Sequence, residues 1–532
     1  MPIYLLITAT VMFLCVILNK ISSKLGIPML LAFILLGMVF GSDGIFKIPF
    51  DDFDLAEKIC SIALIFIMFY GGFGTNWGEA KPVVIKATLL SSFGVVMTAG
   101  IVGAFCYFIL RINWQESLLI GSVISSTDAA SVFYILRSKH LNLKYNTASL
   151  LEVESGSNDP FSYMLTAIMI SIMKGTSGGG SIAYLIFSQL VYSIIIGAFL
   201  AVLFSWLLER IHFKSSGFDA IFVTAVAIIA YAAPAAIGGN GYLSTYIVGI
   251  VLGNRQIHNK KTLVPFFDGI NGFMQMVIFF LLGLLSFPSR LPEVFIIAIP
   301  IALFLTFIAR PIVVLFILSP FKSKLSQMLV VSWAGLRGAA SIVFAVMVMM
   351  GVKTENDIFH IVFCVVLFSI LLQGSLLPMV SIRLGLIDAN ADVMKTFSDY
   401  TDELPIRFIQ VFLNKDHPWC NCPIKDIILP PDTLLVLIQR GEENLVPKGT
   451  TQLICGDSLV LSAKSPEVTT GIELTEKIVE ETDSFVGKKI KEIKSNMTPL
   501  IAVIVRNNEV VIPNGDTIIE AKDLLVIHHE RE

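Results

Sequence analysis

The sequence predicts a polytopic α-helical membrane domain followed by small α+β cytoplasmic modules, and three observations support this prediction. The chain is 55% hydrophobic and only 15% charged, whereas soluble domains carry about 25% charged residues. Before about residue 385 the apolar residues fall into runs of roughly 18 to 25, the length with which a helix crosses a bilayer core of about 30 Å. From about residue 389 onward, short alternating apolar runs and charged turns take their place.

Thirteen apolar runs are predicted to span the membrane. No positively charged segment precedes the first run and no cleavage site follows it, so we expect a retained helix rather than a removed signal peptide. The second and ninth runs are short for full crossings. The predicted spans are 3–18, 28–41, 59–75, 84–109, 117–136, 147–173, 182–207, 217–237, 242–254, 264–286, 292–318, 326–351 and 359–384.

The loops between these runs alternate in charge. One set holds 14 basic residues against only Glu79 and Glu209, and the alternate set holds 6 basic residues against about 9 acidic ones. We expect the protein in the inner (cytoplasmic) membrane. Because loops rich in basic residues stay in the cytoplasm, the N-terminus is predicted to lie outside and the C-terminus in the cytoplasm. The net charge of −3 and the lack of a long basic tract argue against nucleic-acid binding.

Cysteines give no sign of a metal site. Cys420 and Cys422 form a C-x-C, but no second Cys/His pair occurs at metal-site spacing. We therefore expect reduced thiols and no bound metal.

Two segments of the membrane part resemble each other: SSTDAASVFYI (Ser125 to Ile135) and GLRGAASIVFA (Gly335 to Ala345). They fall in the fifth and twelfth predicted spans, which are seven apart and so cross in opposite directions. Polar or glycine-rich breaks at matching places in two halves are typical of discontinuous helices around a midplane transport site. We therefore expect inverted repeats of six helices with crossed, discontinuous helices, although A-A-S by itself is common in membrane helices.

Charged residues also fall in the middle of predicted spans. A charge there costs about 2.5 to 3.5 kcal/mol on insertion scales, so each should face a partner or a cavity. Arg337 is the only cation assigned to such a position, and Glu154 or Asp128 could neutralise it, which would leave Asp159 free to titrate. The alternative is a silent network in which all four are paired. Glu152 lies nearer the predicted cytoplasmic end and is expected to be interfacial.

Neutral oxygen ligands accompany Asp159 in the sequence. On a helix, Ser155 shares a face with Asp159, and Glu154 shares a face with Asn158. Ser155, Asn158 and Thr127 would add hydroxyl and amide oxygens, which suit a hard monovalent cation. One carboxylate could then hold either that cation or a proton.

Five motifs resemble, in their order along the chain, those of the monovalent cation:proton antiporter-1 family, in particular its bacterial NhaP branch. The motifs cover about residues 120–345, and the pattern of spans extends the likeness over 1–385. Val153 departs from the family, which often has glycine at that place. The motifs are SSTDAASVF, LEVESGSNDP, GNGYLSTYIVGIVLGN, ARP at Ala309 to Pro311, and SWAGLRGAA.

The resemblance implies a cation- and proton-binding site. Asp159 would be the ion-binding carboxylate, with Asn158 as its neighbour and Ser155 as a ligand. Thr127 and Asp128 would lie where the unwound helices cross.

The resemblance also implies supporting structure around that site. Glu154 and Arg337 would form a structural ion pair. The protein would be a homodimer that works by an elevator-like movement between a core and a dimerisation domain.

From residue 404 the chain repeats itself with an offset of 66, so that Arg440 matches Arg506 and Asp457 matches Asp523. Alternating apolar residues, a charged turn, P-x-G and a further β run predict a small β-rich unit with one helix in each copy. The predicted domains are an exchanger domain over 1–388, a linker over 389–403, and two modules over 404–465 and 466–532.

These modules resemble the C-terminal subdomain of RCK (TrkA-C) regulators of potassium transport, here in tandem. The dinucleotide-binding half is absent, since no G-x-G-x-x-G occurs, and no cofactor is expected. In some bacteria RCK C-terminal dimers bind cyclic di-AMP, and such contacts would fall at Arg440, Asn444 and Pro447. The alternative is a plain β-turn with a surface arginine in a module that acts as a scaffold.

The function that follows from the resemblance is secondary antiport of a monovalent cation for protons, not enzymatic catalysis. A single carboxylate beside Asn158 favours one-for-one exchange, to which the membrane potential contributes nothing. The tail modules favour potassium, with sodium or lithium as the alternative. An ion channel or an intramembrane hydrolase is a remote alternative, because the sequence lacks a filter motif such as T-V-G-Y-G and a Ser–His pair in apposed spans.

Overall fold

The computed structural model divides into two compact units, Met1–Asp402 and Glu403–Glu532, and each is considered by itself. The predicted domain boundaries near 388, 404 and 465 lie outside the described residues. The residues described are 2–25, 29–50, 52–139, 141–175, 179–211, 216–255, 257, 260–387, 406–414, 417–427, 429, 433–440, 443–464, 473–479, 483, 486–492, 500–506, 509–511, 513, 515, 517–521 and 523–529.

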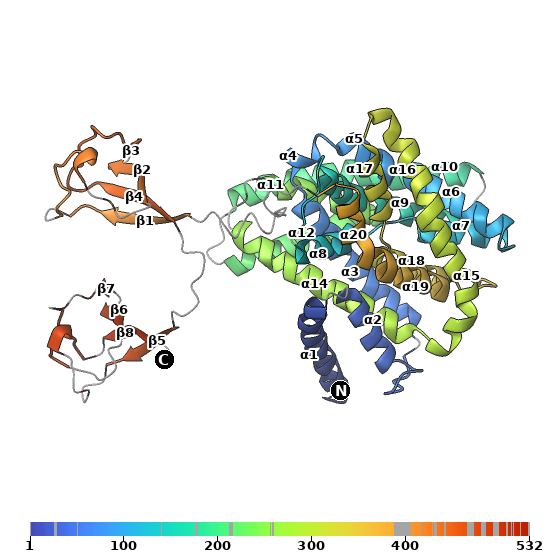
Figure 1. Ribbon diagram of the computed structural model, residues 1–532, viewed down its shortest axis with the longest axis horizontal. Coiled ribbons are helices and arrows are strands. Elements are labelled where there is room, and N and C mark those ends of the chain that lie inside the picture. The colour runs from blue at the N-terminus through green and yellow to red at the C-terminus, as the bar shows by residue number, and fades with distance from the viewer. Residues whose placement is uncertain are drawn as a thin grey trace. The chain divides into compact units, whose positions relative to one another are not determined.

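The first unit is helical, and every one of the thirteen predicted spans contains helix (Figure 1). Three continuous spans contain a π-helical turn, at Ser188–Tyr192, Leu305–Ala309 and Ser369–Gly374. The helices are α1 Pro2–Leu25, α2 Met29–Phe40, α3 Phe53–Gly74, α4 Trp77–Ala80, α5 Val84–Ser91, α6 Phe93–Phe108, α7 Trp114–Val123, α8 Ala129–Ser138, α9 Thr147–Met173, α10 Gly179–Phe187, α11 Ser193–Arg210, α12 Ser216–Ala235, α13 Gly241–Gly253, α14 Lys260–Leu285, α15 Leu291–Phe304, α16 Arg310–Leu318, α17 Leu325–Trp333, α18 Ala339–Gly351, α19 Ile358–Phe368 and α20 Ser375–Arg383.

Six helical stretches in the described part of the chain are long and apolar enough to cross a membrane. Other spans fall short of that measure because they are interrupted, are short, such as α13 with 13 residues, or contain several polar residues, such as α9. The six stretches are Val84–Phe108, Gly180–Arg210, Gly217–Ala235, Thr262–Leu285, Pro288–Phe321 and Ile358–Arg383.

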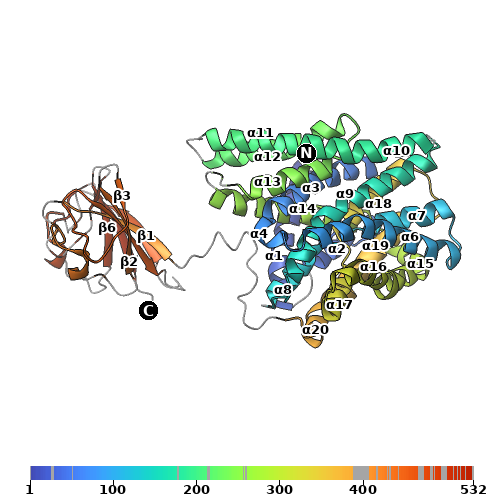
Figure 2. The ribbon, with the colours of Figure 1, turned by 90° about the horizontal axis from the view of Figure 1, so that it is seen from above.

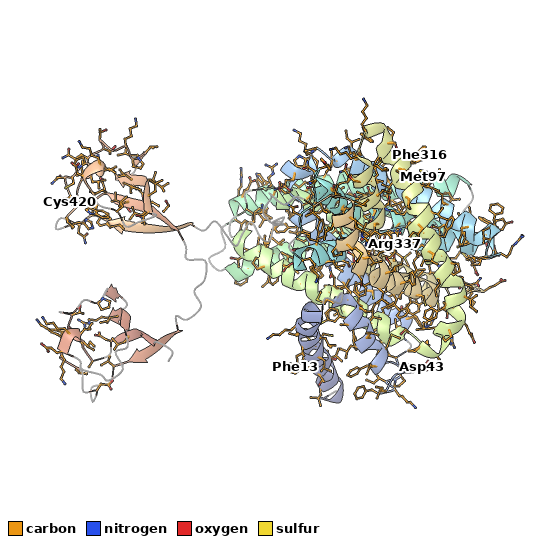
Figure 3. The ribbon with its side chains drawn as sticks, viewed as in Figure 1. Phe13, Asp43, Met97, Phe316, Arg337 and Cys420 are labelled. Atoms are coloured by element: carbon orange, nitrogen blue, oxygen red, sulfur yellow. The ribbon has the colours of Figure 1, made fainter. Side chains whose placement is uncertain are left out.

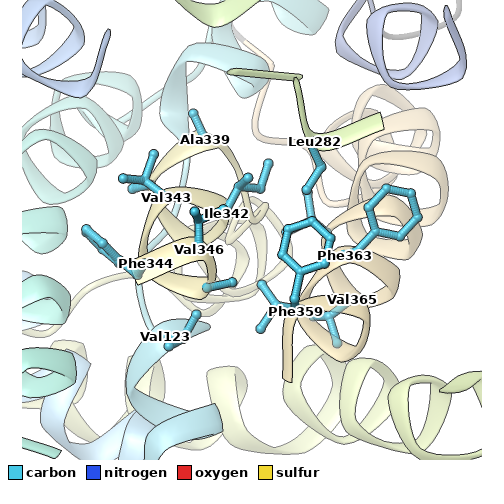
Figure 4. Close-up of a cluster of buried hydrophobic side chains, with 14 of the residues drawn as sticks. Val123, Leu282, Ala339, Ile342, Val343, Phe344, Val346, Phe359, Phe363 and Val365 are labelled. Carbon is cyan, nitrogen blue, oxygen red and sulfur yellow. The ribbon is translucent and has the colours of Figure 1, made fainter. Parts of the chain in front are cut away.

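The helices form two bundles that share a third core. One core unites α5, α8, α9, α16, α17 and α20, and another unites α3, α11, α12, α13 and α14. In Figure 2 the second group lies together, with α11 and α12 along its edge. The shared core lies where α18 packs against α3 and α14, and Figure 4 shows Ile342 of α18 with Phe359 and Phe363 of α19 and Leu282 of α14.

Helices α3 and α13 approach each other closely because glycines line their contact. A Cβ atom added to Gly249 would lie 2.5 Å from the Phe69 carbonyl oxygen, and one added to Gly253 would lie 2.1 Å from the Phe73 carbonyl oxygen. Small residues allow such close backbone packing between membrane helices, where apolar burial alone drives little association. Helices α3 and α13 are therefore joined by direct backbone contact.

The fifth and twelfth spans are broken, as the sequence predicted. Helix α7 ends at Val123 and α8 begins at Ala129, while α17 ends at Trp333 and α18 begins at Ala339. Both second halves begin at the A-A-S of the repeated segment, which confirms the two discontinuous helices. The two breaks meet, since the Asp128 backbone N–H donates to the Leu336 carbonyl oxygen at 2.8 Å.

The second unit contains two copies of one antiparallel sheet. Both copies have a register shift at equivalent places, between Leu435 and Leu437 and between Ile501 and Val503. Within the described residues the helical part of each copy is a 3-10 turn, shorter than the one helix predicted. The strands, in sheet order, are β1 Ile406–Phe412, β4 Ser458–Lys464, β2 Thr433–Arg440 and β3 Glu443–Leu445, then β5 Glu473–Ile478, β8 Leu524–His529, β6 Leu500–Arg506 and β7 Glu509–Val511.

Each sheet is secured by one arginine–aspartate pair. The Arg440 Nε and a terminal nitrogen donate to both oxygens of Asp457 at 2.8 Å, and Arg506 binds Asp523 in the same way. Each aspartate side chain is 1% exposed, and its arginine holds its pKa below the ordinary value. A lowered carboxyl pKa contributes stability above the unfolded-state pKa, and that stability is lost as the pH falls.

We expect Arg440→Gln to destabilise the first sheet by about 1–3 kcal/mol, because Asp457 would lose two charge-assisted hydrogen bonds. In the unaltered protein, protection of both sheets should fall below about pH 4, as the aspartates take up protons. Amide hydrogen exchange of β4 in the full chain measures both effects. Arg506→Gln is the matched control, and it should loosen β8 instead; equal loosening of both sheets by either variant would contradict this account.

Candidate ion-binding site

The two helix breaks expose backbone groups in the middle of the first unit, and Arg337 satisfies some of them. Its terminal nitrogen donates to the carbonyl oxygens of Ser125, at 2.9 Å, and Ser126. Its own backbone N–H donates to the Ser369 hydroxyl at 3.1 Å, in the π-helical turn of the last span. Figure 3 places Arg337 in the interior of the helical unit. The guanidinium thus joins the second break to the first.

Helix α9 passes beside the first break and binds it through neutral side chains. The Ser155 hydroxyl donates to the Thr127 carbonyl oxygen at 2.8 Å and accepts from the Ala129 N–H at 2.9 Å. The Asn158 amide nitrogen donates to the Thr127 hydroxyl at 2.6 Å. Of the predicted ligands, Thr127, Ser155 and Asn158 therefore form one connected group.

Three buried acceptor oxygens on α9 have no hydrogen-bond partner. One belongs to Glu154, whose other carboxylate oxygen binds Arg310. The other two are one carboxylate oxygen of Asp159 and the amide oxygen of Asn158, in side chains that are 8% and 1% exposed. The Ser126 hydroxyl and the Asp128 carboxylate lie near Asp159. Buried acceptors without partners are rare because each loses its hydrogen bonds to water and gains none within the protein. The arrangement can therefore hold a cation or a proton.

Asp128 lies at the site but has a structural task. Its carboxylate accepts from the Ala130 N–H at 2.9 Å and from the Ser131 hydroxyl at 2.5 Å, so it caps the start of α8. A Cβ atom added to Gly338 would lie 2.3 Å from an oxygen of Asp128, which explains the glycine after Arg337. Both carboxylate oxygens of Asp128 are thus engaged, whereas one oxygen of Asp159 is not.

The predicted pair between Glu154 and Arg337 is wrong. Glu154 binds Arg310 instead, and both side chains are almost fully buried, at 1% and 4% exposed. Arg337 is drawn to the backbone carbonyls of Ser125 and Ser126, which the helix break leaves without helical partners. Arg337 lies close enough to Glu154 and Arg310 to interact with their charges. The three residues thus form one charged cluster in which Glu154 and Arg310 are the close pair.

Sequence reasoning missed Arg310 as a buried cation. It begins α16 directly after the π-helical turn Leu305–Ala309, and Gly335 packs against its side chain. The ARP motif was the available signal, because it places an arginine inside the eleventh predicted span, where a charge needs a partner. π-helical turns often occur at functional sites, and this one directs Arg310 towards α9.

The predicted ligand residues of the tail have ordinary structural places. The Arg440 guanidinium is bound to Asp457 and to the Gln452 carbonyl oxygen, at 2.9 Å. Asn444 lies in β3 opposite Gln439, and Pro447 follows that strand.

Comparison with known proteins supports these observations. The transmembrane sodium/hydrogen exchanger family matches residues 9–383, which is most of the chain. The chain belongs to the sodium/hydrogen exchanger family. It is a multi-pass membrane protein that exchanges a cation for protons, and the TrkA-C domain family matches residues 474–528 of its tail.

Named relatives of this exchanger lie in bacteria and archaea. It is 33% identical over 464 residues, 86% of this chain and 80% of the relative, to the K(+)/H(+) antiporter NhaP2 of Shewanella sp. strain ANA-3. It is 31% identical to the K(+)/H(+) antiporter NhaP of Alkalimonas amylolytica, over 87% of this chain and 82% of that protein. The solved structure of the sodium proton antiporter MjNhaP1 from Methanocaldococcus jannaschii has the same fold, with a TM-score of 0.64 and 23% identity, and covers 72% of this chain and 99% of its own.

We expect Glu154→Gln to destabilise the exchanger by about 3–5 kcal/mol, because Arg310 would keep a buried charge without its partner. Arg310→Met should cost a similar amount, and the double variant should recover part of the loss. Thermal unfolding in detergent, followed by size-exclusion chromatography, measures the coupling in a double-mutant cycle. A stronger coupling of Glu154 with Arg337 than with Arg310 would contradict the observed pairing.

Proposed function

We propose that this exchanger transports potassium against protons and that Asp159 is the carboxylate that binds them in turn. The observation that carries this proposal is the pair of buried acceptor oxygens on Asp159 and Asn158 that have no hydrogen-bond partner. Oxygen ligands suit a hard monovalent cation, and a carboxylate can exchange that cation for a proton. Thr127, Ser155 and Asp128 hold the breaks around them and offer further oxygens.

Potassium is proposed because two bacterial relatives that match most of the chain are named K(+)/H(+) antiporters. Sodium is the second candidate, since a relative at 28% identity from Methanocaldococcus jannaschii is named a probable Na(+)/H(+) antiporter. Oxygen ligands by themselves do not separate these two cations. The remaining parts of the proposal are a homodimer in the inner membrane, an N-terminus outside and a C-terminus in the cytoplasm.

In proteoliposomes, potassium should dissipate an imposed pH gradient faster than sodium or lithium. Asp159→Asn should reduce the rate to that of empty liposomes, because it removes the titrating oxygen. Asp54→Asn, at an exposed carboxylate of α3, is the control and should exchange normally. Full exchange by Asp159→Asn would disprove the site, whereas exchange of sodium without potassium would overturn only the choice of cation.

The same proteoliposomes test the proposed one-for-one stoichiometry. Exchange of one cation for one proton moves no net charge, so a solid-supported membrane should record no transient current on cation addition. A current that grows with the imposed membrane potential would contradict electroneutral exchange, since each transported charge gains about 2.3 kcal/mol per 100 mV.

We also propose that the tail modules regulate exchange. The Arg440 guanidinium is already bound to Asp457. A nucleotide such as cyclic di-AMP could therefore bind Arg440 only if this ion pair broke. Removal of residues 403–532 should shift the pH or cation dependence of exchange in proteoliposomes. Unchanged dependence, in a variant whose thermal unfolding in detergent remains normal, would make the modules a scaffold.

A further inference from the structure

Four residues of α9 lie on one face of the helix: Glu152, Gly156, Asp159 and Tyr163. They follow each other at spacings of four, three and four, which place side chains in one row along a helix. Asp159 is thus the third position of a stripe that begins near the Thr147 end of the helix, which the loop charges place in the cytoplasm.

Helix α13 faces this stripe with two tyrosines that are themselves four residues apart. The rings of Tyr242 and Tyr163 meet edge to face, with centroids 5.1 Å apart. The ring of Tyr246 covers Gly156, where an added Cβ atom would lie 2.4 Å from Cε2 of that ring. Asp159 therefore lies between the two contacts, with Tyr246 on the Thr147 side.

Tyr246 is buried, at 3% exposed, and its hydroxyl makes no hydrogen bond. The polar groups around that hydroxyl are Thr75, Glu152 and Asp159. Burying a hydroxyl without a partner costs free energy, whereas a phenylalanine would fill the same space at no such cost. The polar atom is therefore explained better by a partner that is present only during transport.

The position of Tyr246 is set by α3 and not by α9. A Cβ atom added to Gly72 of α3 would lie 2.4 Å from the Tyr246 carbonyl oxygen, so the two backbones are in contact. The Asn254 side chain, just after α13, donates to the Thr75 carbonyl oxygen and accepts from the Trp77 N–H, both at 2.8 Å. Tyr246 thus lies on a helix that shares a core with α3, whereas α9 contributes to the core that includes α8 and α17.

We propose that Tyr246 is a positioning residue that gates the ion site on the Thr147 side of α9. Its ring covers Gly156 between Glu152 and Asp159, and its hydroxyl would accept or donate a hydrogen bond when a cation or proton moves between these two carboxylates. A hydroxyl suits this task because it both donates and accepts. Gly156 leaves the room that the ring needs, and Glu152 is the outer carboxylate of the same route. The proposal rests on Asp159 as the ion-binding carboxylate.

Tyr246→Phe tests the gate, because it keeps the ring and removes only the hydroxyl. Cation-dependent proton exchange of the full chain is compared in everted vesicles, which expose the cytoplasmic face, and in right-side-out vesicles. We expect the apparent KM for the cation to rise roughly three- to tenfold on the cytoplasmic face, the size expected for one lost hydrogen bond, with little change on the other face. Tyr107→Phe, at an exposed tyrosine of α6, is the matched control and should leave both faces unchanged.

Two results would overturn the gate. One is an unchanged KM on both faces, and the other is an equal change on both faces, which would indicate a general effect on packing. Asp159→Asn separates this inference from the proposed function: if it retains exchange, the ion site itself is wrong. If Asp159→Asn is inactive while Tyr246→Phe matches the unaltered protein on both faces, only the gate is wrong.

Discussion

The structure depends on one constraint, which is that backbone groups freed in the middle of a membrane protein must find partners within the protein. Two helices stop and restart where they contact each other, and neither break can rely on bulk water. The Asp128 N–H in the first break donates a hydrogen bond to the Leu336 carbonyl oxygen in the second, and Arg337 donates to two further carbonyl oxygens. Ser155 supplies both a donor and an acceptor from α9. The side chains of Arg337 and Ser155 are thus engaged in hydrogen bonds to the backbone of the breaks.

The proposed ion site consists of polar atoms that these backbone contacts leave unpaired. Asp128 is occupied as the cap of α8, and Glu154 is occupied by Arg310. Asn158 donates to Thr127 through its nitrogen, which leaves its oxygen free beside the free oxygen of Asp159. A buried charge pair is weak support for stability but strongly couples its two members. The pair Glu154–Arg310 therefore fixes α9 against α16 without engaging Asp159, the carboxylate proposed to carry exchange.

The site lies where the two bundles meet, and this division gives the exchange its mechanical setting. The α3–α13 contact is backbone against backbone, so α13 presents its tyrosines to α9 from a firm support. Helix α9 contributes Val153 to the core that includes α8 and α17, whereas α13 contributes Val248 and Leu252 to the core that includes α3. A relative movement of the bundles would change the distance between the Asp159 carboxylate and the Tyr246 hydroxyl. The sheets of the second unit are each complete by themselves, with one buried aspartate bound by one arginine.

The sequence by itself determined the features that follow from local pattern: the thirteen spans from apolar run length, the two breaks from the A-A-S repeat, and the tandem sheets from the offset of 66. It also singled out four residues, because polar side chains in an apolar run are costly to bury without a partner. They are Asp159, Asn158, Ser155 and Thr127. Only the tertiary structure decided that Glu154 binds Arg310, and that Gly156 makes room for Tyr246. Those contacts join residues 156 and 90 positions apart, and helical spacing relates only residues within a few turns. Which buried cation meets which carboxylate is decided by how the helices pack.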